Sequence, residues 1–156
     1  MNQDFVDLLR AFVEADVRFL VVGAYALALH AKPRATGDLD LWVEPDPENA
    51  ARVIQALRQF GAPLTQVNES DFIRQGTVFQ IGVVPRRIDI LTGLTGITFP
   101  EAWEDRVPHK MGSCDVFFLG KRTLVKNKKA LGRAKDLADL EALASHDQES
   151  GGDTRD

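Results

Sequence analysis

The sequence predicts an α/β (α+β) domain in which helices flank a mixed central sheet and a helix pair closes the chain. Apolar residues recur with the period of a helix in some segments and alternate with polar residues in others. The two kinds of segment follow one another along the chain and do not form separate blocks. A length of 156 residues suits one domain with a sizeable core.

Each predicted element has a boundary signal of its own. The first strand is rich in β-branched and aromatic residues and ends at Gly23, and the helix opened by Pro47 stops at Gly61. Gly132 separates the two closing helices. In chain order, the sequence predicts helix 2–15, strand 17–22, helix 24–31, strand 39–43, helix 47–60, strands 77–83 and 87–91, helix 99–106, strand 115–119, and helices 121–131 and 133–144.

Composition bounds the class of protein. The hydrophobic fraction of 44% and the charged fraction of 27% are those of an ordinary soluble domain. One cysteine excludes an intrachain disulfide, and the apolar runs are too short to span a membrane. With no visible signal peptide, we expect a cytoplasmic protein. We expect a single domain over residues 1–145 and a disordered acidic tail over residues 146–156, where four acids face one arginine.

The stretch 34–43, RATGDLDLWV, carries two carboxylates inside a strand-like run. Residues i and i+2 of a strand point to the same side, so Asp38 and Asp40 present their carboxylates together while Leu39 and Leu41 anchor the strand. Like charges this close repel, and a bound divalent cation removes that penalty. Oxygen ligands suit Mg²⁺ or Mn²⁺.

A third acid, Asp89, lies in the strand Arg87–Leu91 between two apolar residues. If the two strands are neighbours, the three acids form a cluster that can hold metal ions and organise in-line attack on a phosphate. Two alternatives stay open. The D-x-D pair could be solvated surface, and Asp89 could be an ion-pair partner of Arg86 or Arg87.

Two further features suit an anionic ligand. Gly23 stands between a strand and a helix start, where free backbone N–H groups can bind phosphates. The segment 121–135 carries seven Lys and Arg residues and no acid. The alternative for this segment is a solvated helix face.

The combination resembles the nucleotidyltransferase fold of the DNA polymerase beta superfamily. Specifically, the chain is similar to small bacterial nucleotidyltransferase-like proteins, with V-V-G at 21–23, R-x-T-x-D-L-D-L at 34–41, R-I-D-I-L-T at 87–92 and N-K-x-x-x-G-R-x-K-D-L-A-D-L at 127–140. The match covers about residues 5–145. The chain is also similar to nucleotidyltransferase toxins of bacterial toxin–antitoxin pairs.

The resemblance implies roles for single residues. Asp38 and Asp40 would ligate Mg²⁺ or Mn²⁺, and Asp89 would complete the metal site and help to deprotonate the acceptor. Gly23, with the backbone of Ala24, would contact the β- and γ-phosphates of a nucleoside triphosphate. Lys128 would be a triphosphate contact, with Arg133 behind it.

Two functions from different classes follow. The first is a metal-dependent enzyme that transfers a nucleotide from an NTP to an RNA or protein acceptor. The second is a catalytically idle module that binds a nucleotide or a partner, for example a toxin–antitoxin component whose partner is an antitoxin. Ala24 favours the second, because the superfamily usually has Gly or Ser there and Ala offers no hydroxyl.

Other residues have simpler expected roles. Trp42, on the strand face of the aspartates, either stacks on a base or packs under the closing helices. Cys114 is expected in the core. Asp136 and Asp139 lie on one helix face, and we expect them to pair with Arg133 and Lys135.

Overall fold

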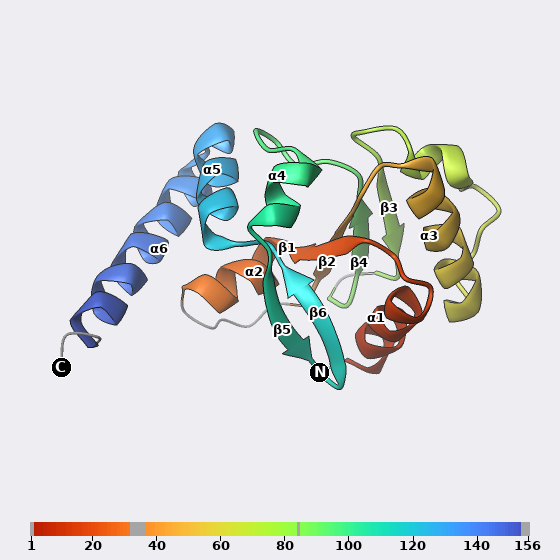
Figure 1. Ribbon diagram of the computed structural model, residues 1–156, viewed down its shortest axis with the longest axis horizontal. Coiled ribbons are helices and arrows are strands. Elements are labelled where there is room, and N and C mark those ends of the chain that lie inside the picture. Colours follow the sequence, from red (N-terminus) through yellow and green to blue (C-terminus); the bar gives the residue numbers. More distant parts are fainter. Residues whose placement is uncertain (1, 32–36, 84, 154–156) are drawn as a thin grey trace.

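The computed structural model describes the backbone of residues 2–31, 37–83 and 85–153, and side chains as far as His146. Figure 1 shows the elements in chain order. They are α1 (Gln3–Glu14), β1 (Phe19–Val22), α2 (Gly23–His30), β2 (Leu39–Val43), α3 (Pro47–Phe60), the 3-10 helix η1 (Glu69–Phe72), β3 (Val78–Ile81), β4 (Ile88–Leu91), α4 (Phe99–Glu104), β5 (Val107–Met111), β6 (Cys114–Phe118), α5 (Lys121–Leu131) and α6 (Ala134–Asp153).

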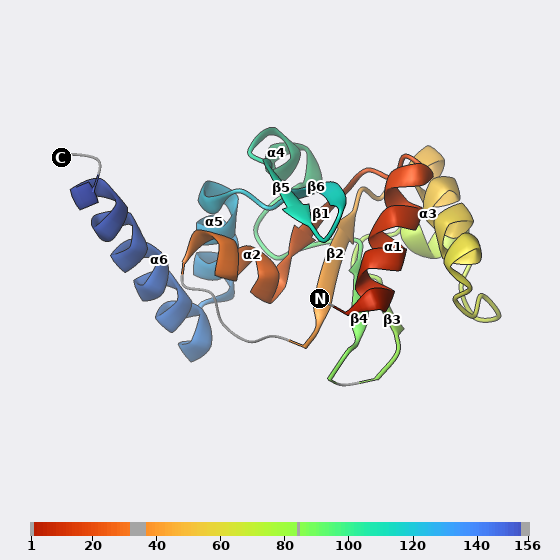
Figure 2. The ribbon, with the colours of Figure 1, turned by 90° about the horizontal axis from the view of Figure 1, so that it is seen from below.

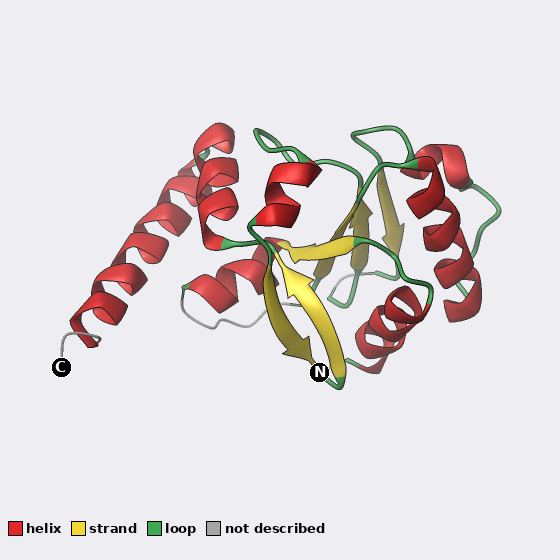
Figure 3. Cartoon of the chain, viewed as in Figure 1, coloured by secondary structure: helices red, strands yellow, loops and turns green. Residues whose placement is uncertain are grey.

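The strands form one mixed sheet with the order β3-β4-β2-β1-β6-β5. The pairs β2–β4 and β1–β6 are parallel, and the pairs β1–β2, β3–β4 and β5–β6 are antiparallel. Figure 3 shows this twisted sheet between the helices. The mixed sheet with flanking helices and a closing helix pair is the architecture that the sequence predicts.

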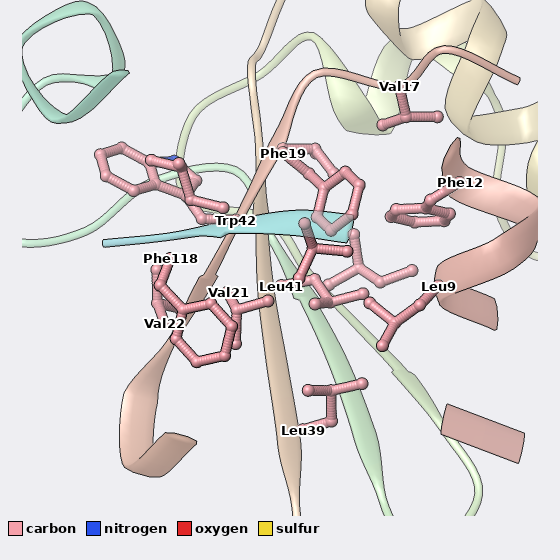
Figure 4. Close-up of a cluster of buried hydrophobic side chains, with 14 of the residues drawn as sticks. Leu9, Phe12, Val17, Phe19, Val21, Val22, Leu39, Leu41, Trp42 and Phe118 are labelled. Atoms are coloured by element: carbon pink, nitrogen blue, oxygen red, sulfur yellow. The ribbon is translucent and has the colours of Figure 1, made fainter. Parts of the chain in front are cut away.

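The central strands have two differently occupied faces. Leu41 of β2 lies toward α1, where Leu9 and Phe12 project, whereas Trp42 points to the other side (Figure 4). All four side chains are buried. Because side chains alternate along a strand, Asp40 lies on the same face of the sheet as Trp42. Burial of the apolar side chains on the opposite face fixes the orientation of the Asp40 side chain.

The helices form two groups at opposite ends of the molecule. The pair α1 and α3 packs together at one end, and α2, α5 and α6 gather at the other (Figures 1 and 2). Helix α6 runs obliquely away from the sheet, and its C-terminal end lies far from the other elements. Among the described residues, no helix combines the length and apolar character that a membrane crossing requires.

The predicted boundary signals act at the helix ends. Asn2, which the sequence prediction placed inside the first helix, instead caps α1 by accepting hydrogen bonds from the N–H groups of Asp4 and Phe5. Gly61 and Gly132, both with positive φ, end α3 and α5.

Three elements differ from the sequence prediction. Strand β5 was not predicted, because its edge position leaves Pro108, His109 and Lys110 exposed and its sequence carries no apolar alternation. The short helix η1 also went unpredicted. Helix α6 continues to Asp153, whereas the sequence prediction ends it at Ala144. Extending an existing helix costs far less free energy than nucleating a new one. This difference offsets the low helix propensity of the residues beyond Ala144.

Candidate functional site

The site is built on the parallel pair β2–β4. Asp40 of β2 is the direct partner of Asp89 of β4, so both side chains leave the sheet on the same face. Asp89 is only 8% exposed, while Asp40 is partly exposed. The apolar neighbours of each acid, Leu39, Leu41 and the isoleucines of β4, are buried on the opposite face and hold the two strands in this register.

Asp38 lies just before β2 and joins the pair through Arg87. The backbone N–H of Arg87 donates to Asp38 Oδ1 at 3.4 Å, and the N–H of Leu39 donates to the Arg87 carbonyl at 3.0 Å. The start of β2 is thereby tied to the start of β4. The three predicted acids therefore lie at one end of two adjacent strands.

The guanidinium of Arg87 connects two of these acids. Its Nη2 lies 3.5 Å from Asp38 Oδ2 and donates to Asp89 Oδ2 at 3.2 Å, and its Nε lies 2.9 Å from Asp89 Oδ1. The expectation that Asp89 could pair with Arg87 is thus correct, and it holds together with the clustering of the acids. The contact of the Arg87 side chain with Asp38 was not predicted from sequence. One sequence feature could have predicted this contact: Arg87 stands two residues before Asp89, and residues i and i+2 of a strand lie on the same side.

Gly23 brings the start of α2 against the carboxylates. It follows β1 directly, and Val22 of β1 pairs with Asp40 across the sheet. Its φ of 66° is in the left-handed region, and a Cβ at this position would collide with the Asp40 carboxylate. Val22, the N-cap residue of α2, makes no side-chain capping hydrogen bond, so it leaves the N–H groups of Gly23 and Ala24 at the helix start uncapped.

Burial and like charge act together on Asp40. Desolvation is the largest cause that raises its pKa, followed by the charges of Asp89 and Asp38, to about 6 from 3.8; Arg87 opposes the shift. The charges of Asp89 and Asp38 therefore raise the pKa of Asp40 more than the Arg87 guanidinium lowers it.

We next asked whether these residues fit a divalent cation. The donors are carboxylate oxygens, the type that Mg²⁺ and Mn²⁺ prefer, and the buried Oδ1 of Asp89 has no hydrogen-bond partner among the described residues. Among these same residues, no group of three acidic, His or Cys side chains is already arranged around one point. The donor set fits a cation, and the arrangement requires the side chains to turn toward it.

Lys128 and Arg133 belong to a separate cluster where α5 meets α6. Lys128 Nζ lies 3.0 Å from Asp139 Oδ2 and 3.5 Å from Asp136 Oδ1, and Arg133 Nε donates to Asp136 Oδ2 at 2.7 Å. The pairing of Asp136 with Arg133 was predicted, whereas the partner of Asp139 is Lys128, where we had expected Lys135. Within the described part of the chain, no contact joins Lys128 or Arg133 to the three-carboxylate group.

Trp42 lies under α4, not under the closing helices. Its ring is 1% exposed and meets Phe99 edge-on at 5.1 Å, so no ring face is open for a base. It lines a cleft of about 330 Å³ with Glu44, Thr92 and Thr98. Cys114 is buried at the start of β6, as expected.

Comparison with known proteins shows the fold. No family model and no curated protein matches the sequence. Among solved structures, the chain is similar to a presumed nucleotidyltransferase (TM1012) from Thermotoga maritima, with a TM-score of 0.55 and 12% sequence identity over 96% of each chain. The likeness spans nearly the whole of both proteins. At this identity it shows the fold alone, and the chain has a nucleotidyltransferase-like α/β fold.

Proposed function

We propose that the chain is a metal-dependent nucleotidyltransferase. One observation carries the proposal: Asp40 and Asp89 are paired on adjacent strands, with Asp38 beside them, against a glycine that opens a helix. A Cβ at Gly23 would collide with the Asp40 carboxylate, so the close approach of this helix start to the acids requires glycine. A site for a phosphate chain needs this arrangement, because backbone N–H groups must come close to the ligand.

Each residue has a role in the proposed reaction. Asp38 and Asp40 would hold Mg²⁺ or Mn²⁺, and the metal would polarise the α-phosphate of a nucleoside triphosphate. The N–H groups of Gly23 and Ala24 would bind the β- and γ-phosphates. Asp89 would accept the proton of the acceptor hydroxyl as its oxygen attacks the α-phosphorus and pyrophosphate leaves.

We propose RNA or protein as the acceptor class and the cytoplasm as the location, and both proposals come from the sequence analysis. Lys128 and Arg133 stay our proposed contacts of the triphosphate. Their present partners are carboxylates, so Lys128 would have to exchange Asp139 for a phosphate oxygen. This exchange is possible for a lysine, whose ammonium group is a compact charge on a flexible stem.

A transfer assay tests the function. The purified chain is incubated with each α-labelled nucleoside triphosphate and Mg²⁺, together with total RNA or lysate protein as acceptor. We expect label in one acceptor class, dependent on the metal and absent with Asp40→Asn. Label transfer that persists in Asp40→Asn would contradict the proposed site.

A second function is favoured by Ala24, which supplies no hydroxyl at the helix start. The chain would then bind a nucleotide or a partner such as an antitoxin without catalysis. Calorimetry distinguishes the two: triphosphate binding without any label transfer supports the idle module.

A further inference from the structure

Arg87 occupies the position between carboxylates where a cation is needed. Its guanidinium contacts Asp38 and Asp89 from one side chain, and both contacts lie within 3.5 Å. Asp40 is the third acid of the group and is coupled to both others by charge. Among the described residues, the Arg87 guanidinium is thus in direct contact with two of the three carboxylates.

The pairing is close but not well formed. Nε of Arg87 and Oδ1 of Asp89 lie 2.9 Å apart, yet both atoms are buried and neither has a properly directed hydrogen bond among the described residues. A permanent structural pair of this kind would be expected to join its two oxygens through parallel N–H donors. At Arg87, Nη2 donates to Asp89 Oδ2, whereas Nε is held near Asp89 by charge attraction and its hydrogen-bonding capacity is left unused.

The guanidinium group can also move away from the carboxylates into solvent. The side chain of Arg87 is 30% exposed, whereas that of Asp89 is 11% exposed. An arginine has a long stem and can move its head into solvent while the stem stays packed. The buried carboxylate cannot follow it, so the departure of Arg87 would leave a vacant position between two oxygens.

We infer that Arg87 is an internal counter-cation that competes with the divalent metal for Asp38 and Asp89. In the metal-free chain it limits repulsion among the three acids and keeps them near one another. When a metal binds, the guanidinium is displaced toward solvent, where it is available to the anionic ligand. The inference rests on the proposed function, because it requires a metal at these carboxylates.

Metal affinity measured without nucleotide tests this role. Mn²⁺ binding is followed by calorimetry and by the loss of the free-ion paramagnetic resonance signal, for the wild type, Arg87→Ala and Arg87→Gln. The matched control is Arg86→Ala, an exposed arginine next in the chain. Circular dichroism establishes that each variant is folded, and the Gln variant retains a long polar side chain if Ala does not fold.

We expect both Arg87 variants to bind Mn²⁺ more tightly, on the order of tenfold, because the metal no longer competes with a unit charge at short range. Arg86→Ala should bind like the wild type. A merely structural role of Arg87 would not increase metal affinity, because lost structure weakens a site.

Three results would overturn the inference. Equal Mn²⁺ affinity in all four proteins would show that Arg87 does not compete, and would leave the metal site itself standing. Weaker Mn²⁺ binding in the Arg87 variants would show that the arginine helps to form the metal site. Absence of Mn²⁺ binding in every protein, or binding that Asp40→Asn leaves unchanged, would reject the metal site of the proposed function and the inference with it.

Discussion

Two clusters of acids and bases lie in this fold, and their balance of charge differs. At the start of β2 and β4, Arg87 contacts two of three neighbouring acids, and burial with like charge raises the pKa of Asp40 to about 6. At the α5–α6 junction, Asp136 has no exposed surface and contacts both Arg133 and Lys128. Its hydrogen bonds with Arg133 lower its pKa to about 2.

The difference indicates which cluster is available for a ligand. The α5–α6 cluster contains its own counter-charges, and Asp136 accepts directed hydrogen bonds from Arg133. It joins two helices. At Asp40, burial and the charges of Asp89 and Asp38 raise the pKa, and the buried Oδ1 of Asp89 has no hydrogen-bond partner among the described residues. Perturbed acids of this second kind are more common at functional sites than in scaffolds.

The largest expected effect is on the stability of the fold, through the α5–α6 cluster. Asp136→Ala removes the acid that Lys128 and Arg133 share and should lower the melting temperature by about 10 °C, because breaking a buried pair leaves charge without a partner. Metal affinity should not change. Differential scanning calorimetry measures the melting temperature, and Mn²⁺ titration measures the metal affinity. A variant as stable as the wild type would mean that the cluster does not hold α6 in place.

Metal binding should stabilise the fold through the other cluster. At 100 times its dissociation constant, Mg²⁺ should raise the free energy of unfolding by ~2.7 kcal/mol, because it binds the folded carboxylates only. This corresponds to a rise of several degrees in melting temperature, and Asp40→Asn should abolish it. Asp115→Asn, at an exposed acid near the start of β6, is the control. An equal rise in Asp40→Asn would place the metal elsewhere.

The sequence predicts the carboxylate group well because strand periodicity fixes it. Alternation places Asp38, Asp40 and Asp89 on polar faces, and the apolar neighbours leave no second register. Pairing between β2 and β4 could not be derived from periodicity, because it depends on the order of strands in the sheet. This pairing therefore remained a condition of the predicted cluster, and the structure shows it.

The missed features depend on tertiary contacts. An edge strand such as β5 needs only one partner and tolerates Pro108, so its sequence carries no pattern. The position of Lys128 follows from the approach of α6 to α5, which brings Asp136 and Asp139 to it. A run of basic residues shows charge along the chain, but the sequence alone does not show which acids will face it.

Lys128 tests whether the two clusters cooperate. If Lys128 exchanges Asp139 for phosphate, Lys128→Ala should weaken nucleotide binding by ~1.5–3 kcal/mol, the range of a charge-assisted hydrogen bond. Metal binding without nucleotide should stay nearly unchanged, because an ammonium group donates and cannot ligate Mg²⁺. Calorimetric titration with a non-hydrolysable triphosphate measures both.

The control for Lys128 is Lys110→Ala, at an exposed lysine of β5 that pairs with Asp115. If Lys128→Ala and this control bind the triphosphate alike, Lys128 belongs to the scaffold only. A loss of stability without a loss of nucleotide affinity would lead to the same conclusion.

The smallest expected effect is on pH dependence, where the two clusters act in opposite directions. The folded pKa of Asp40 is about 6, raised from 3.8, so the folded chain binds more protons than the unfolded chain between about pH 4 and 6. The free energy of unfolding should therefore fall as the pH rises through this window. Asp136, with its pKa lowered to about 2, stabilises the fold above about pH 4 and loses this contribution as the pH falls toward 2.

The Asp40 contribution can be isolated by comparing the metal-free wild type with Asp40→Asn. A shift from 3.8 to about 6 corresponds to about 3 kcal/mol, and partial exposure of the carboxyl reduces the expected loss between pH 4 and 7 to ~1–2 kcal/mol. Urea unfolding at several pH values in the presence of a chelator measures it, and Asp40→Asn should lack this component. Parallel pH profiles of the two proteins would show that Asp40 ionises at its ordinary pKa, and the contrast between the clusters would then rest on Asp136 alone.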